Sequence, residues 1–251
     1  MPDNPSFIPD PGLVQELESL VKSHKGLTAW EKIKELPALE NWRGFEGRII
    51  ASKLASGLGN HQLGSVIDWL NWKEHPENDR AYFRGLFPRF SVKGTALLVP
   101  EMEARLAQMK PGTEIYSDLL GLIASCHMDV REFQESHRLL DQALIGCEDP
   151  SWLLVQRSIV YYRQDRYEEA LEAVLEARKV RPYYRPVVST LSRTLTSLGR
   201  DEEARDALID ASHHTDSPEM PLKLSVIFSE EDTIRPGNLS VRWFSLLLAQ
   251  G

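Results

Sequence analysis

A period of about 34 residues in the second half of the chain is the feature that most constrains its fold. Three columns of small side chains and one column of apolar side chains recur at this interval. The columns are Ser136, Ala170 and Ala204; Ala143, Ala177 and Ala211; Ala124, Ser158 and Ser192; and Leu120, Leu154 and Val188. Small residues at fixed places let two helices approach closely. The period therefore predicts stacked helix-turn-helix units.

The segment "RYEEALEAVLEARKVRP", residues 166–182, has the pattern of a second helix in such a unit. Its small and apolar residues recur at i, i+3, i+4 and i+7, which is one helix face. Acidic residues in its first turns and basic residues in its last turns complement the helix dipole. Glu168–Glu169 recur one period later as Glu202–Glu203. Catalytic carboxylates would need unlike environments, so this repetition indicates a solvated outer face.

These units resemble the tetratricopeptide repeat (TPR), a helix-turn-helix unit of about 34 residues with a proline near its end. The unit at 151–184 matches best, through Ser158, Tyr161, Ala170, Ala177 and Pro182. Trp152 and Arg157 depart from the tryptophan and leucine of the motif. The resemblance implies an all-α fold: a right-handed TPR-type helical solenoid of antiparallel helix pairs with helical caps.

The same comparison divides the chain into segments. We expect three TPR repeats at 117–218, with bounds 117–150, 151–184 and 185–218, and degenerate or irregular repeats at 45–116. Within the latter, Gly59 falls in the turn between helices, Gly64 takes the place of the first alanine, and "GLFPRFSVKG" is expected to be an insertion. The remaining segments are a disordered N-terminal segment (1–10), an N-terminal helical cap (11–44) and a C-terminal helical cap or tail (219–251).

Charge and composition narrow the class of partner. The 251 residues carry a formal net charge of −8, which argues against sequence-independent binding of nucleic acid or anionic lipid. No stretch approaches the roughly 20 apolar residues that span a bilayer, and the start "MPDNPSFIPDPG" lacks the pattern of a signal peptide. Cys126 and Cys147 lie outside any CxxC arrangement. These features predict a cytoplasmic protein with free thiols.

Candidate catalytic and metal-binding residues are few. Cys126 and His127 are adjacent, but neighbours on a helix point about 100° apart and cannot pair as nucleophile and base. His213, His214 and Asp216 form a short cluster that no metal-binding motif supports. "GLGNHQLG" lacks the spacing of a phosphate loop. We therefore predict no catalytic residue, no metal site and no cofactor.

The first helix of each repeat lines the concave side in the TPR family, so candidate binding residues are sought there. The register of the motif places these partner-binding candidates inward: Trp152, Val155, Ile159, Tyr162, Arg163, Ser189 and Arg193. Aromatic and arginine side chains are enriched at binding hot spots, although Trp152 or Tyr162 could equally pack on a neighbouring repeat. Some TPR proteins clamp a peptide carboxylate with basic residues. Gly121, Val155 and Ser189 stand at one of those basic positions, which disfavours such a clamp.

Two functions follow as hypotheses. The first is a non-catalytic protein-protein interaction scaffold that binds a peptide or partner helix in the concave groove. The alternative rests on a weaker similarity of "DRYEEALEAVLEARKVRPYYRPVV" to the repeat region of bacterial proteins that join TPRs to a papain-like cysteine peptidase domain. The chain would then be an accessory region of a larger bacterial enzyme, with the catalytic domain absent from it.

Overall fold

The computed structural model describes residues 6–95 and 97–216. In these residues the regular structure is helical, and the sole β feature is an isolated bridge between Phe7 and Trp42. The helices are α1 (Pro11–Lys22), α2 (Gly26–Ile33), η1 (Leu39–Asn41), α3 (Phe45–Gly57), α4 (His61–Glu74), α5 (Asp79–Lys93), α6 (Val99–Leu106), α7 (Glu114–Asp129), α8 (Phe133–Leu144), α9 (Ser151–Tyr162), α10 (Tyr167–Val180), α11 (Arg185–Ser197) and α12 (Asp201–His214).

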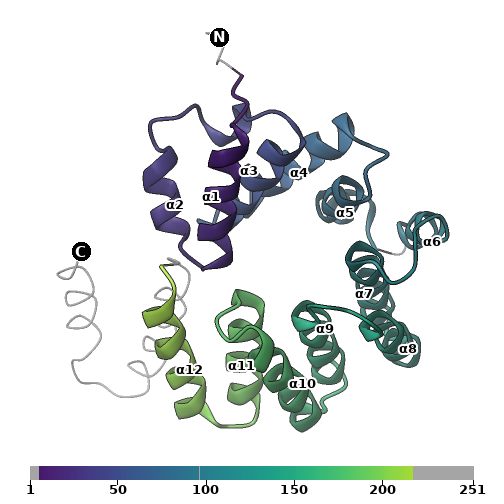
Figure 1. Ribbon diagram of the computed structural model, residues 1–251. Helices are drawn as coiled ribbons and strands as arrows, with labels where there is room; N and C mark the ends of the chain where they lie inside the picture. The colour runs from purple at the N-terminus through teal and green to yellow at the C-terminus, as the bar shows by residue number, and fades with distance from the viewer. Residues whose placement is uncertain (1–5, 96, 217–251) are drawn as a thin grey trace.

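Consecutive helices pack as antiparallel pairs that follow one another around a ring (Figure 1). The pairs with the most extensive contacts are α9 with α10, α7 with α8, and α3 with α4, followed by α4 with α5 and α11 with α12. The first helices α5, α7, α9 and α11 lie nearer the centre of the ring than α6, α8 and α10 (Figure 1). Each of the three predicted repeats thus contains one helix pair, although α7 begins at Glu114, shortly before the expected start at 117.

The small residues of the sequence columns lie where the two helices of a pair touch. All the column residues named from the sequence are buried. The hydroxyl of Ser158 on α9 donates to the backbone oxygen of Ala170 on α10, with 2.7 Å between the oxygens. Such a bond is possible because neither position carries a side chain large enough to separate the helices. The small columns therefore hold the two backbones of a pair close together.

The pair α3–α4 repeats this arrangement in a diverged sequence. The Ser52 hydroxyl donates to the backbone oxygen of Gly64 at 3.0 Å, which matches Ser158 and Ala170. A Cβ on Gly64 would lie 2.3 Å from the Ser56 hydroxyl oxygen and 3.1 Å from the Ser52 backbone oxygen. Asn71, at the second alanine position, is buried and donates to the backbone oxygen of Phe45 at 3.3 Å. Gly64 and Asn71 therefore both lie at buried positions of α4.

The turns inside the helix pairs share a left-handed residue. Gly59, Arg131, Asp165 and Gly199 all have positive φ, between 58° and 88°. Arg131, Asp165 and Gly199 follow one another at exactly the interval of the small columns, whereas Gly59 precedes Arg131 by slightly more than two such intervals. Gly94, which follows α5, also has a positive φ of 78° and lies one residue more than the regular interval after Gly59, so most of the additional length falls between Gly94 and Arg131.

The segment between Gly59 and Arg131 corrects one expectation. "GLFPRFSVKG" is not an insertion: residues 85–93 continue α5, with Pro88 inside the helix. Proline has no N–H to donate and its ring bends a helix, yet α5 runs on past Pro88 to Lys93. Asn78 caps the start of α5 through the Arg80 and Ala81 N–H groups, and Arg89 on α5 holds the short helix α6 through a bidentate pair with Glu101.

The N-terminal segment also differs from expectation. Within the segment expected to be disordered, Phe7 pairs with Asn41 and Arg43 through backbone hydrogen bonds of 3.0 and 2.8 Å, and its ring meets Trp42 edge-on at 5.1 Å. Trp42 is fully buried and donates from Nε1 to Pro37 O at 2.8 Å. Helix α1 packs against α3 and α2. The predicted C-terminal cap or tail at 219–251 lies outside the described residues.

The two ends of the described chain meet. Asp216, just after α12, accepts hydrogen bonds from the Leu27 and Thr28 backbone N–H groups at 3.1 and 3.0 Å and from the Thr28 hydroxyl at 2.9 Å. Helix α2 has no side-chain cap from Lys25, its own N-cap residue. Asp216 therefore supplies that cap from the far end of the described chain and closes the ring.

Candidate inner-face binding site

The structure brings Tyr162 of α9 together with Arg193 and Ser197 of α11. The Arg193 guanidinium lies over the Tyr162 ring, 4.6 Å from its centroid. The Tyr162 hydroxyl is 2.9 Å from the Ser197 hydroxyl. Tyr167 meets the Tyr162 ring edge-on at 5.2 Å. Arg193 remains exposed, so this cluster offers a positioned cation beside an aromatic surface.

Arg163 follows Tyr162 in the sequence and is a second cation at this end of α9. It is the C-cap residue of α9 and is exposed. A ring beneath a guanidinium restricts its motion without neutralising its charge. The Tyr162–Arg193 pair and Arg163 together therefore suit an acidic group carried beside an apolar or aromatic side chain.

Trp152, predicted for the same site, lies elsewhere. It is at the opposite end of α9 from Tyr162, which is about 15 Å along a helix. Its ring meets Phe83 of α5 edge-on at 6.1 Å and rests on Gly121 of α7, where a Cβ would come within 2.7 Å of the indole. Trp152 is therefore a packing residue that joins α9 to the preceding helices.

Val155 is not on the inner surface. Its side chain is 2% exposed and packs among residues of α9, α10 and α11. The register of the motif assigns it inward, but α11 covers that part of α9. Ile159 is half-buried between the two neighbouring core clusters, and Ser189 is half-buried on α11. The contacting residues that reach solvent are thus Tyr162, Arg193 and Ser197.

An acidic group lies on the α7 side of the ring. Burial, together with the charges of Glu114 and Asp149, raises the pKa of Asp118 to about 7. Asp149 also pairs with Arg181 at 3.4 Å, and that guanidinium lies over the Tyr184 ring, 4.2 Å from its centroid. The Asp118 carboxyl therefore changes its charge near neutral pH.

The residues examined for catalysis or metal binding have other partners. Cys126 is 3% exposed, and burial raises the pKa of its thiol to about 12, so it is not an activated nucleophile. His127 contacts Glu132, with 2.6 Å between Nδ1 and the carboxylate. His214 stacks on Tyr183 with 4.2 Å between ring centroids. Over residues 6–95 and 97–216, no group of three or more His, Cys, Asp or Glu side chains could hold a metal ion.

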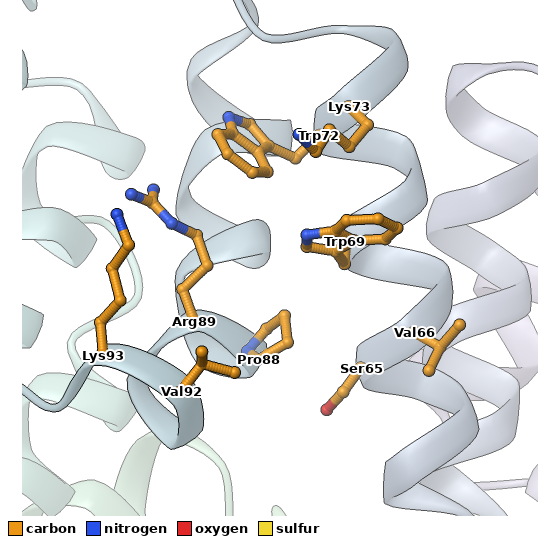
Figure 2. Close-up of a pocket in the computed structure, with 9 residues that line it drawn as sticks. All are labelled: Ser65, Val66, Trp69, Trp72, Lys73, Pro88, Arg89, Val92 and Lys93. Carbon is orange, nitrogen blue, oxygen red and sulfur yellow. The ribbon is translucent and has the colours of Figure 1, made fainter.

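The structure also contains a groove that was not predicted from the sequence. Between α4 and α5 lies a groove of about 480 Å³, lined by Ser65, Val66, Trp69, Trp72, Lys73, Pro88, Arg89, Val92 and Lys93 (Figure 2). Trp69, Trp72 and Lys73 have the i, i+3, i+4 spacing of one helix face. That spacing could have indicated the α4 side of the groove from the sequence. The α5 side was not predicted, because residues 85–94 were expected to be an insertion.

None of the helices that the structure describes is both long and apolar enough to cross a bilayer.

Comparison with known proteins supports the fold. No protein-family model and no curated protein matches the sequence. Among solved structures, a thermophilic TPR protein of Thermus thermophilus is similar over 74% of this chain and 99% of its own, with a TM-score of 0.59 and 14% identity. MamA matches 65% of this chain and 93% of its own, at 12% identity, with a TM-score of 0.43, too low to add to the argument. The chain therefore has the all-α TPR solenoid fold that its sequence predicted.

Proposed function

We propose that this chain is a non-catalytic protein-interaction module that binds an acidic peptide segment on the inner face of its solenoid. The observation that carries the proposal is the Arg193 guanidinium held over the Tyr162 ring at 4.6 Å, with the ring fixed in turn by Ser197. A positioned arginine loses little side-chain freedom when it pairs with a carboxylate. Arg163, the residue after Tyr162 at the end of α9, is a second exposed cation on the same helix.

Peptide selection from a random displayed library on the purified chain tests this function. We expect selected peptides to carry Asp or Glu beside an aromatic or aliphatic residue. The double variant Arg163→Glu/Arg193→Glu should weaken their binding roughly tenfold to a hundredfold, because charge-assisted hydrogen bonds contribute about 1.5–3 kcal/mol. Isothermal titration of the selected peptides gives the affinities.

The matched control is Lys110→Glu/Lys179→Glu, two exposed lysines away from this cluster. It changes the net charge by the same amount and should leave the affinity within twofold of wild type. If both double variants weaken binding equally, only the overall charge matters and the inner-face assignment is wrong. If the selected peptides bind all three proteins alike, the peptide site lies elsewhere.

A further inference from the structure

The groove between α4 and α5 has a charge opposite to that of the whole molecule. Three of its nine lining residues are basic, namely Lys73, Arg89 and Lys93, and none of the nine is acidic. The chain as a whole has a net charge of −8. A basic groove on an acidic protein is a local feature that the overall composition conceals, and it selects for an anionic occupant.

The three cations gather at one end of the groove. The Lys73 ammonium lies 5.4 Å from the Trp72 ring centroid, and the Arg89 guanidinium lies 4.6 Å from it. Figure 2 shows the Lys93 ammonium close to the Arg89 guanidinium, and both groups help to lower the pKa of Glu101. That carboxylate offsets one of the three positive charges, so the Trp72 end keeps a positive balance.

The other end of the groove is apolar. Val66 on α4 is 52% exposed and Val92 on α5 is 85% exposed, and both line the groove. Trp69 is also partly exposed and lies between the two ends, opposite Pro88 (Figure 2). Exposed valine and tryptophan side chains that share one hollow are a typical lining of a docking surface.

The packing of α4 on α5 makes the groove a fixed feature. A Cβ on Gly85 would lie 2.6 Å from Trp72 Cβ, so only glycine allows α5 to come this close to α4. Arg89 is fixed from the opposite side by Glu101 of α6. On α4 the lining runs from Ser65 to Lys73, which is about 12 Å of helix. That length suits about two turns of a docked helix.

We propose that this groove binds an acidic amphipathic helix of a partner protein, with aliphatic side chains on Val66, Val92 and Trp69 and carboxylates at Lys73, Arg89 and Lys93. The groove shares no residue with the inner-face cluster. It is therefore a second interaction surface that does not depend on the function proposed above. A module with two separate surfaces can hold two partners at once.

Fluorescence polarisation of a labelled synthetic peptide on the full chain tests the proposal. The probe is a helix-forming peptide about three turns long, with leucines at i, i+3 and i+7 and four glutamates toward one end. We expect its glutamine counterpart to bind at least tenfold more weakly. Val92→Glu and the double variant Lys73→Glu/Lys93→Glu should each weaken binding of the glutamate peptide at least tenfold.

The controls separate this surface from the inner face and from general charge effects. Val180→Glu places a glutamate on an exposed valine in the last turn of α10, as Val92→Glu does in α5, and should bind like wild type. So should Lys110→Glu/Lys179→Glu and Arg163→Glu/Arg193→Glu. Helicity by circular dichroism and the urea midpoint show whether each variant is folded.

Four outcomes would overturn the proposal. The first is equal affinity for the glutamate and glutamine peptides. The second is unchanged affinity in folded Val92→Glu. The third is a wild-type dimer in sedimentation velocity that Val92→Glu dissociates, which would make a second copy of the chain the occupant. The fourth is binding to phosphatidylserine vesicles that Lys73→Glu/Lys93→Glu abolishes, which would make the occupant a lipid surface.

Discussion

Asp118 shows how a single residue on the inner side of the ring can set the pH dependence of the whole fold. Its carboxyl is largely buried beside Glu114 and Asp149, and no hydrogen bond contributes to its shift. Burial and like charges both disfavour the ionised form, which is why its pKa rises to about 7. In the unfolded chain the same carboxyl titrates near its ordinary value of about 3.9.

The sign of the effect on stability follows from these two pKa values. Between about pH 4 and pH 7 the folded chain keeps a proton on Asp118 that the unfolded chain has lost. The free energy of unfolding therefore falls as the pH rises through this window, and the loss is complete above the folded pKa.

We therefore expect Asp118→Asn to stabilise the fold at pH 8 and to have little effect at pH 4. The gain at pH 8 should be on the order of 2 kcal/mol, since each pKa unit corresponds to about 1.4 kcal/mol and partial exposure screens the charge. Urea unfolding at both pH values measures it. Asp129→Asn, an exposed position on the same helix, is the control. Equal stabilisation at both pH values would contradict the role given to ionisation.

At the scale of helices, the sequence contains the information that specifies the pairing. The small columns predict which helices meet and in which register. In each repeat, the close contact between the two helices leaves room only for a small side chain at the same position. The same reasoning placed Gly64 at the first alanine position, although few other residues of the motif occur in that unit. In the structure, the backbone oxygen of Gly64 accepts a buried hydrogen bond from Ser52. The sequence pattern was enough to predict a contact where both of its residues lie within one repeat.

Contacts between repeats were the part that local rules did not predict. Val155 was expected on the inner surface, but α11, the first helix of the next repeat, covers it. Trp152 was expected to bind a partner, but Gly121 leaves a space on α7 that its ring fills. "GLFPRFSVKG" was expected to be an insertion, but α5 continues through it and Gly85 allows close contact with Trp72 of α4. Tyr162 and Arg193, both among the partner-binding candidates, lie in contact across the two repeats.

The close contact between α9 and α10 gives a direct test at this scale. Ala177 is fully buried, so Ala177→Leu should overpack the pair and lower the free energy of unfolding by roughly 1–3 kcal/mol. Glu176→Leu makes the same side chain at the exposed neighbouring position and should change stability by less than about 0.5 kcal/mol. Chemical denaturation of both variants measures the difference. A tolerated leucine at residue 177 would mean that the column does not set the helix spacing.

At the scale of the whole molecule, the ring is closed by a small number of polar contacts. Asp216 binds the N-terminus of α2, its backbone N–H donates to His24 O at 3.1 Å, and Arg185 lies 3.1 Å from the His61 ring nitrogen. Within each repeat, by contrast, helices are joined by buried apolar clusters. The contact between the two ends is therefore the place where the described fold can open at least cost. Opening there would widen access to the inner face without unfolding any repeat.

Asp216→Ala tests this closure because it removes both the cap and its charge at the α2 N-terminus. Loss of a helix cap costs about 0.5–2 kcal/mol, so this variant should weaken the contact between the two ends. We expect a larger radius of gyration and maximum dimension by small-angle X-ray scattering, with unchanged helicity by circular dichroism. Asp206→Ala, an exposed aspartate on α12, makes the same charge change and should leave the scattering curve unchanged.

A double-mutant cycle with Thr28→Ala, which removes one of the donors to Asp216, should give a coupling energy of at least about 0.5 kcal/mol. Additive effects and an unaltered radius of gyration would show that the ring is held by the stacking of the repeats and not by its ends.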